Sequence, residues 1–267
     1  YENKYYKYED PEYSITQTPL NEQDLKMMSE AVEVLRQFKG FSYFTEMSDI
    51  INRLEDHVAS ARMKTTPVID FEKNESLKGL DYLDTIYHAI VNEHPIQLKY
   101  RSFKARSANN FIFYPYLLKE YRNRWFVYGV RGNGRILQNL ALDRIQSLEV
   151  LPQEHYIKNT FFDPNTFFDD LVGVTKNSGS VAEKVGFKVA AAEAPYIITK
   201  PIHRSQQVVE RLADGSVILE IEVVINHELE QVFFGYAEGI HVLYPKTLVE
   251  LMGRKLKKAA EQYTHSK

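Results

Sequence analysis

The sequence predicts an α+β protein with a helical N-terminal connector, a small β-barrel and a C-terminal ferredoxin-like α/β domain. Apolar residues recur at helical spacing before Ile96 and at strand spacing after it. Five short aromatic-rich segments with tight turns follow Ile96, as in small barrels. Beyond residue 183 strands and helices alternate, as in a ferredoxin-like fold. The 267 residues are enough for about two domains.

Three helices are expected in the first part of the chain. Asn21 is a suitable N-cap for the first helix, and Gly40 is placed to end it. A second helix begins near Thr45. The third covers about residues 77–93 and ends before Pro95, because the residue before a proline disfavours helical backbone.

Five strands are predicted after the third helix, each rich in aromatic and β-branched residues. Gly132-Asn133-Gly134 is typical of a hairpin turn between two of them. The five segments are IQLKYRSF, NFIFYPYLLKEY, RWFVYGV, RILQNLAL and RIQSLEVL.

A second folded region is expected after a linker over residues 154–180. It begins with the strand KVGFKVA, and the segment PYIITKPI is either a short helix or extended. A hairpin is centred on Ala213-Asp214-Gly215. The helix HELEQVFFGYAEG, the strand IHVLYP and a terminal helix from Pro245 to about Gln262 complete the region.

Several kinds of chemistry are disfavoured by the composition. The absence of cysteine excludes thiolate catalysis and thiolate metal sites, and it is compatible with a cytoplasmic location. The eight histidines show no metal-ligand spacing, and phosphate-loop, dinucleotide and nucleophile-elbow motifs are absent. No run of about 18 apolar residues predicts a membrane span. We therefore expect no enzyme activity, no cofactor, no metal and no membrane contact.

Positive charge is concentrated in one part of an acidic chain. Residues 99–144 contain ten Lys and Arg against two Asp and Glu, although the whole chain has a formal charge of -3. A local excess of cations creates a positive potential that attracts an anion. The excess is too small for a surface that binds duplex DNA along the whole protein.

The motifs IQLKY, YPYLLKEYRNRWFVYGV and ALDRI resemble the WYL domain, a ligand-sensing module of bacterial transcription regulators. The three-letter signature stands here as Trp125, Phe126 and Val127, with two conservative departures. Relatives often carry an arginine where this chain has Ala141 and a cation where it has Gln138. The surrounding residues that fit the pattern are Pro115, Tyr116, Lys119, Arg124, Asp143 and Arg144.

The resemblance extends over nearly the whole chain. KVGFKV, HRSQQVVERLADGSVILEIEV and GYAEGIHVLYPKTL are similar to the extension that commonly follows WYL domains, and PLNEQDLKMM to the connector that precedes them. The resemblance also implies a winged helix-turn-helix upstream of Tyr1, and the absence of an initiator Met agrees with a shortened chain. The expected divisions are a connector (1–75), a WYL barrel (76–152), a linker (153–182) and a C-terminal α/β extension (183–267).

The family implies an Sm-like or SH3-like barrel with a basic pocket for a negatively charged or nucleic-acid-like ligand. Arginine pairs bidentately with phosphate, and aromatic faces beside it can stack a base. The candidate ligand-binding residues are Tyr100, Arg101, Lys119, Arg122, Arg124, Trp125 and Arg144.

Each candidate also has a structural interpretation. Trp125 can pack in the core, and Arg144 can form an ion pair with Asp143. Strand alternation would place Arg122 and Arg124 on one face and Trp125 on the other. Tyr100 can pack with its hydroxyl at the rim. Gln138 and Asn139 could instead hydrogen-bond a base edge or a polar small molecule.

The leading hypothesis is the effector-sensing and dimerisation region of a bacterial transcription regulator. An anionic effector, a nucleotide or single-stranded nucleic acid, would bind the barrel of a homodimer, which would contact duplex DNA only through the upstream domain. A second hypothesis is a single-stranded nucleic-acid-binding accessory module of a defence or repair system. A structural dimerisation unit and an enzyme acting on an anion are the remaining alternatives.

Overall fold

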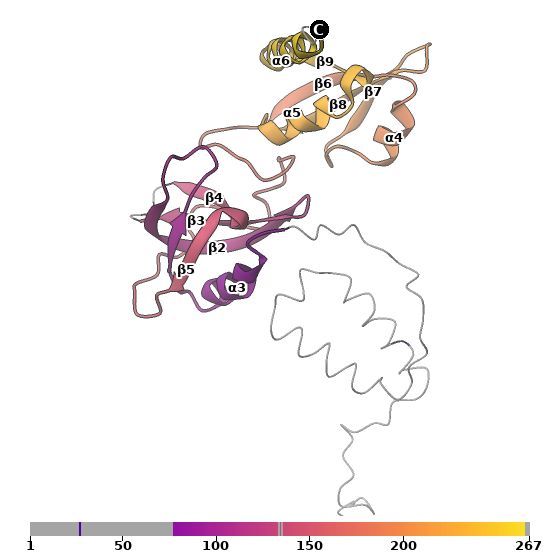
Figure 1. Cartoon of the computed structure of the whole chain (residues 1–267). Coiled ribbons are helices and arrows are strands. Elements are labelled where there is room, and N and C mark those ends of the chain that lie inside the picture. Colours follow the sequence, from indigo (N-terminus) through magenta and orange to yellow (C-terminus); the bar gives the residue numbers. More distant parts are fainter. Residues whose placement is uncertain (1–26, 28–76, 133, 135, 265–267) are drawn as a thin grey trace, which may run out of the picture. The chain divides into compact units, whose positions relative to one another are not determined.

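The computed structural model describes residue 27, residues 77–132, residue 134 and residues 136–264 (Figure 1). The chain divides between residues 84 and 85 into two units. The helices expected from Asn21 and from Thr45 lie outside the described residues, except that Met27 has helical backbone. The third predicted helix is present as a 3-10 turn, η3 (Leu80–Tyr82), followed by α3 (Leu83–Val91).

The first sheet contains the five predicted strands in the order β4-β3-β2-β1-β5, all antiparallel. No pairing joins β4 to β5 within residues 77–264 as far as these are described, so closure into a barrel stays a prediction. The strands are β1 (Ile96–Tyr100), β2 (Asn109–Tyr121), β3 (Arg124–Arg131), β4 (Leu137–Ala141) and β5 (Ile145–Val150).

Burial in this sheet follows the strand period on one strand and departs from it on another. In β1 the alternate residues Ile96, Leu98 and Tyr100 are buried, whereas Lys99 is exposed. In β3 four consecutive residues, 127–130, are buried, which requires cover on both faces. The second layer of cover comes from the linker that follows β5.

The β2–β3 connection is a two-residue turn made by Arg122 and Asn123, with φ of 49° and 62°. Two consecutive residues at positive φ are typical of the type I′ hairpin, whose twist matches that of the strands. Arg122 therefore lies in a turn and not in a strand. Strand alternation therefore does not apply to Arg122, and its expected position on the same face as Arg124 stays a prediction.

Aromatic residues of the 153–182 linker pack onto β3. The ring centroids of Phe162, Phe167 and Phe168 lie 6.2, 5.8 and 5.3 Å from that of Tyr128. The Tyr128 hydroxyl donates a hydrogen bond to the Val174 carbonyl oxygen. The linker aromatics thus form a packed layer on the first sheet.

A second aromatic group joins the linker to β2. The Tyr116 ring lies 6.1 Å from both Tyr156 and Phe161, and it stacks on Phe161. The Tyr116 hydroxyl is buried without a hydrogen-bond partner among the described residues. Burial raises the pKa of Tyr116 to about 12, above its ordinary value of 10.0.

Alkaline pH is expected to destabilise the native chain in part through Tyr116. The unfolded chain loses the proton of this hydroxyl near pH 10, at a lower pH than the folded chain does. The contribution of the protonated Tyr116 to stability is therefore fully present below pH 10 and is lost as the pH rises toward about 12. Tyr116→Phe removes this contribution and should flatten the decline. Urea unfolding at a series of pH values measures it, and identical slopes for the two proteins would contradict the expectation.

The second sheet is also antiparallel, with the order β7-β8-β6-β9. The predicted hairpin joins β7 to β8, and Asp214 accepts a hydrogen bond from the Ser216 amide at 2.9 Å within its turn. The ambiguous PYIITKPI segment contains a short helix. The elements are β6 (Glu183–Val189), α4 (Ala194–Thr199), β7 (Gln207–Arg211), β8 (Val217–Val223), α5 (His227–Phe234), η5 (Ala237–Gly239), β9 (Ile240–Tyr244) and α6 (Lys246–Thr264).

One hydrophobic core joins this sheet to its helices. Phe187 of β6 packs against Phe233 of α5 with ring centroids 5.1 Å apart, and both side chains are buried. Leu248 and Met252 of α6 belong to the same cluster. The alternating apolar residues of the strands supply one face, which the helices cover.

Candidate functional site

Two of the predicted cationic residues meet on one carboxylate. η4 (Leu142–Arg144) carries Asp143, whose oxygens lie 3.2 Å from Arg124 Nε and 3.7 Å from Arg144 Nε. Asp143 Oδ1 and Arg144 Nε are both buried and have no hydrogen-bond partner among the described residues. Two guanidinium groups thus share one carboxylate, so the group of three side chains has a net positive charge. The guanidinium groups also retain N–H donors that Asp143 does not use.

Tyr100 completes this cluster from the end of β1. Its side chain is buried, and the Arg101 amide donates a 3.1 Å hydrogen bond to the Arg144 carbonyl oxygen, which holds β1 beside η4. Burial raises the pKa of the Tyr100 hydroxyl, and the positive charge of Arg144 partly offsets the rise. The hydroxyl therefore stays protonated at neutral pH and can donate a hydrogen bond to an anion. We call Tyr100, Arg124, Asp143 and Arg144 the arginine cluster.

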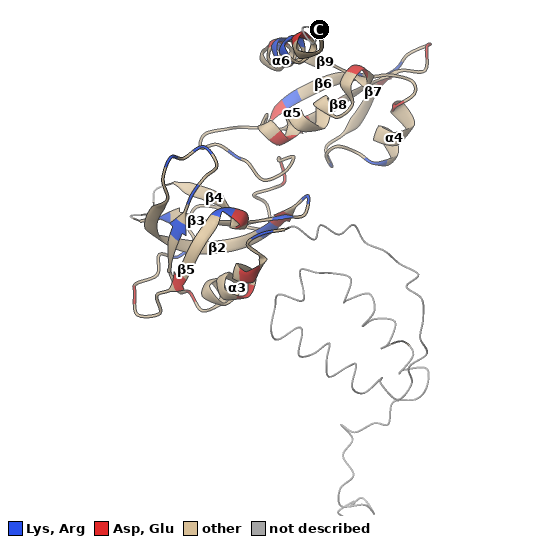
Figure 2. Cartoon of the chain, in the orientation of Figure 1, with Lys and Arg blue, Asp and Glu red and all other residues tan. Residues whose placement is uncertain are grey.

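The β1–β2 loop (101–108) lies against the arginine cluster through Phe103. The Arg144 guanidinium carbon lies 4.6 Å from the centroid of the Phe103 ring. Arg101 turns back into its own loop, where Nε donates to the Ala105 carbonyl oxygen at 3.4 Å. Figure 2 shows Lys and Arg on this loop and around the β2–β3 turn.

The other predicted residues make different contacts. The Lys119 ammonium lies 4.7 Å from the ring centroid of Phe168 in the linker, and Arg122 is exposed and lies over Tyr121 at 5.4 Å. Trp125 is half-buried and pairs with Glu120 across β2 and β3. The described contacts thus bring together Tyr100, Arg124 and Arg144, with Arg101 joined through its backbone.

Asn139, considered above as a partner for a base edge, has a partner within the protein. Its Nδ2 donates to the Val174 carbonyl oxygen at 2.7 Å, the same oxygen that accepts from Tyr128. This contact fixes the linker on β3 and β4.

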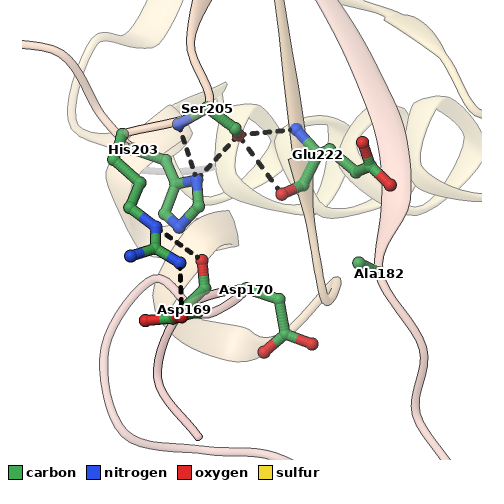
Figure 3. A pocket seen from close by; sticks show the side chains of 7 residues that line it. Asp169, Asp170, Ala182, His203, Ser205 and Glu222 are labelled. Carbon is green, nitrogen blue, oxygen red and sulfur yellow. Dashed lines mark hydrogen bonds and ion pairs between the residues drawn. The ribbon is translucent and has the colours of Figure 1, made fainter. Parts of the chain in front are cut away.

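A hollow of about 490 Å³ lies elsewhere, at β8 and the linker (Figure 3). His203 Nδ1 accepts from the Ser205 amide at 3.2 Å, and burial lowers the pKa of the imidazole, which favours the neutral ring. Arg204 is paired with Asp169 at 2.7 Å. The lining residues are Asp169, Asp170, Ala182, His203, Arg204, Ser205 and Glu222, and their three carboxylates suit an anion poorly.

Metal-binding groups and membrane-spanning helices are both absent from the described part of the chain. Residues 77–132 and 136–264 contain no group of three or more His, Asp or Glu side chains that could hold a metal ion. Within the same residues no helix combines the length and apolar character needed to cross a bilayer.

The comparisons with known proteins identify both folded regions. Residues 81–150 match the WYL domain model, and the first sheet and arginine cluster lie within them. The chain thus belongs to the class of proteins with a WYL domain. Residues 182–260 match the WCX domain model, so the chain carries a WYL domain followed by a WCX domain. Both domains are typical of regulators that are not enzymes.

Two solved structures are similar to parts of the chain. Proteasome accessory factor B/C (PafBC) of Arthrobacter aurescens is 17% identical with a TM-score of 0.30, over 67% of this chain and 27% of that one. A CRISPR Cas-related protein is 13% identical with a TM-score of 0.43, over 70% of this chain and 53% of that one. The chain therefore spans about a quarter and about half of these proteins. No curated protein sequence matches it.

Two features of the site region were missed by the sequence analysis. Phe103 stands between cations in RSFKARSA, which is a pattern that could have marked it as an aromatic contact. The linker aromatics in FFDPNTFFDD indicate burial, because a flexible linker is poor in such residues.

Proposed function

We propose that the chain is the effector-sensing region of a transcription regulator and binds an anionic, nucleic-acid-like ligand at the arginine cluster. The observation that carries this proposal is the sharing of Asp143 by Arg124 and Arg144 within a WYL domain. A phosphate that approaches can take hydrogen bonds from both guanidinium groups, and Tyr100 can add another.

The fold supports the proposed arrangement of domains. The order β4-β3-β2-β1-β5 is compatible with an Sm-like barrel over residues 76–152, in which the curved sheet closes on itself. The order β7-β8-β6-β9, with helices after β6 and β8, supports a ferredoxin-like region over residues 183–267. Residues 1–75 would connect them to an upstream DNA-binding domain.

The linker offers a route from the ligand to the C-terminal region. Val174 accepts hydrogen bonds from β3 and β4, and its neighbours Val172 and Thr175 accept 2.9 Å hydrogen bonds from Asn226 at the start of α5. In the proposed homodimer the ligand would favour one of two arrangements, because allostery requires different affinities for the two states.

A single-stranded nucleic-acid-binding module is the second candidate. It is favoured by the exposed Phe103 between the cations of the β1–β2 loop, since aromatic and basic side chains together bind single strands with little sequence preference.

Calorimetry with short single-stranded oligonucleotides, nucleotides and pyrophosphate tests both candidates. Binding of a defined nucleotide with an altered oligomeric state supports the sensor. Binding of any sequence, with affinity that falls by about 0.7 log units per contacted phosphate for each log unit of salt, supports the second candidate. If no anion binds or raises the melting temperature, a structural dimerisation unit is favoured and both proposals fail.

A further inference from the structure

Phe103 is unusually exposed for an aromatic side chain with a defined contact. Its exposed fraction is 74%, and one face of its ring is occupied by the Arg144 guanidinium at 4.6 Å. A guanidinium lies over an aromatic face because the ring quadrupole attracts the cation. With three quarters of the residue in solvent, much of the ring remains available to a ligand.

We infer that Phe103 is a stacking surface for a nucleobase whose phosphate is bound by Arg144. This inference rests on the proposed function and adds the residue that would stack the base beside the bound phosphate. The same side chain, Arg144, contacts the Phe103 ring and belongs to the arginine cluster. A base on the ring and a phosphate on the guanidinium would therefore be neighbours, as they are in a nucleotide.

The surroundings of Phe103 favour a base over an apolar partner. Lys104 and Arg106 are exposed, and Ser102 is half-buried, so the loop offers a single aromatic ring among polar and cationic groups. A protein or membrane surface would need a contiguous apolar patch. A base needs one aromatic face and nearby cations for the backbone.

The test compares a thymidine oligonucleotide with a strand of the same length that lacks the bases, by calorimetry on the full chain. Phe103→Ala is expected to weaken binding of the thymidine strand by about 5- to 150-fold, the range for loss of one stacked base. Binding of the baseless strand should change by less than about twofold, since its phosphates do not need the ring. Phe103→Tyr should retain wild-type affinity.

Tyr196→Ala is the matched control, because Tyr196 is similarly exposed, at 69%, and lies in α4. It should bind both strands as the wild type does. Thymidine monophosphate shows whether the ligand is a free nucleotide or a nucleic-acid strand. If its binding depends on Phe103, a free nucleotide is indicated. If only the binding of the strand depends on Phe103, nucleic acid is indicated.

The inference is overturned if Phe103→Ala binds the thymidine strand as wild type does, or if both strands bind wild type equally. Such results leave the proposed function standing as long as binding still requires Arg124 and Arg144. Failure of the proposed function has a different signature, since neither strand would then respond to loss of the two arginines.

Discussion

Replacing Arg124 and Arg144 together with alanine is expected to weaken binding of a single-stranded oligonucleotide by more than about 100-fold. Hydrogen bonds to charged groups contribute about 1.5–3 kcal/mol each, and each arginine offers at least one to the phosphate. Arg124 has a side chain 48% exposed, so its loss should cost the fold little. Calorimetry and a thermal melt on the same samples separate lost binding from lost structure.

Two companion variants make the result specific. Lys200→Ala combined with Arg211→Ala removes the same number of charges from exposed positions of the second region, and it should alter affinity less than about fivefold. Asp143→Asn removes the carboxylate that competes for both guanidinium groups and should raise affinity. If the Lys200 and Arg211 double variant weakens binding as much as the Arg124 and Arg144 double variant does, the loss of net positive charge explains the effect and the arginine cluster does not.

The strands were predictable because their cause is local. β1 shows alternating burial at Ile96, Leu98 and Tyr100, and the β7–β8 hairpin is marked by a turn residue that permits positive φ, Gly215 at 82°. The αL backbone of Arg122 was harder to predict, since few residues other than glycine and asparagine adopt it. The turn is set by the register of Tyr121 with Arg124, which is a property of the paired strands.

The candidate site was predictable only in composition. The sequence supplied the cations, but it did not show that Arg124 and Arg144 would share Asp143 while Lys119 lies over Phe168. Such choices depend on contacts between residues far apart in the chain. The packing of the linker was unpredictable for the same reason, because its aromatic residues contact Tyr128 of β3, which is far away in the sequence.

Asn226→Ala is expected to lower the free energy of unfolding of the second region by about 3 kcal/mol, since several buried hydrogen bonds are lost together. Asn226 is buried, and its Oδ1 accepts from the Leu229 amide at 2.9 Å as the N-cap of α5. Its Nδ2 donates to the carbonyl oxygens of Val172 and Thr175. Alanine leaves these three backbone groups without the side-chain partner that pairs them in the native chain.

Asn226→Ser separates the two roles, because serine can cap the helix but has no amide to reach the linker carbonyls. It should recover about 1 kcal/mol of the loss, the usual contribution of an N-cap. Urea unfolding gives the stabilities, and hydrogen exchange should show faster exchange in residues 170–176 for both variants, since both release the linker. A loss below about 1 kcal/mol for alanine would mean that Asn226 contributes only its cap, and the linker would then be held by Tyr128 and Asn139 through Val174.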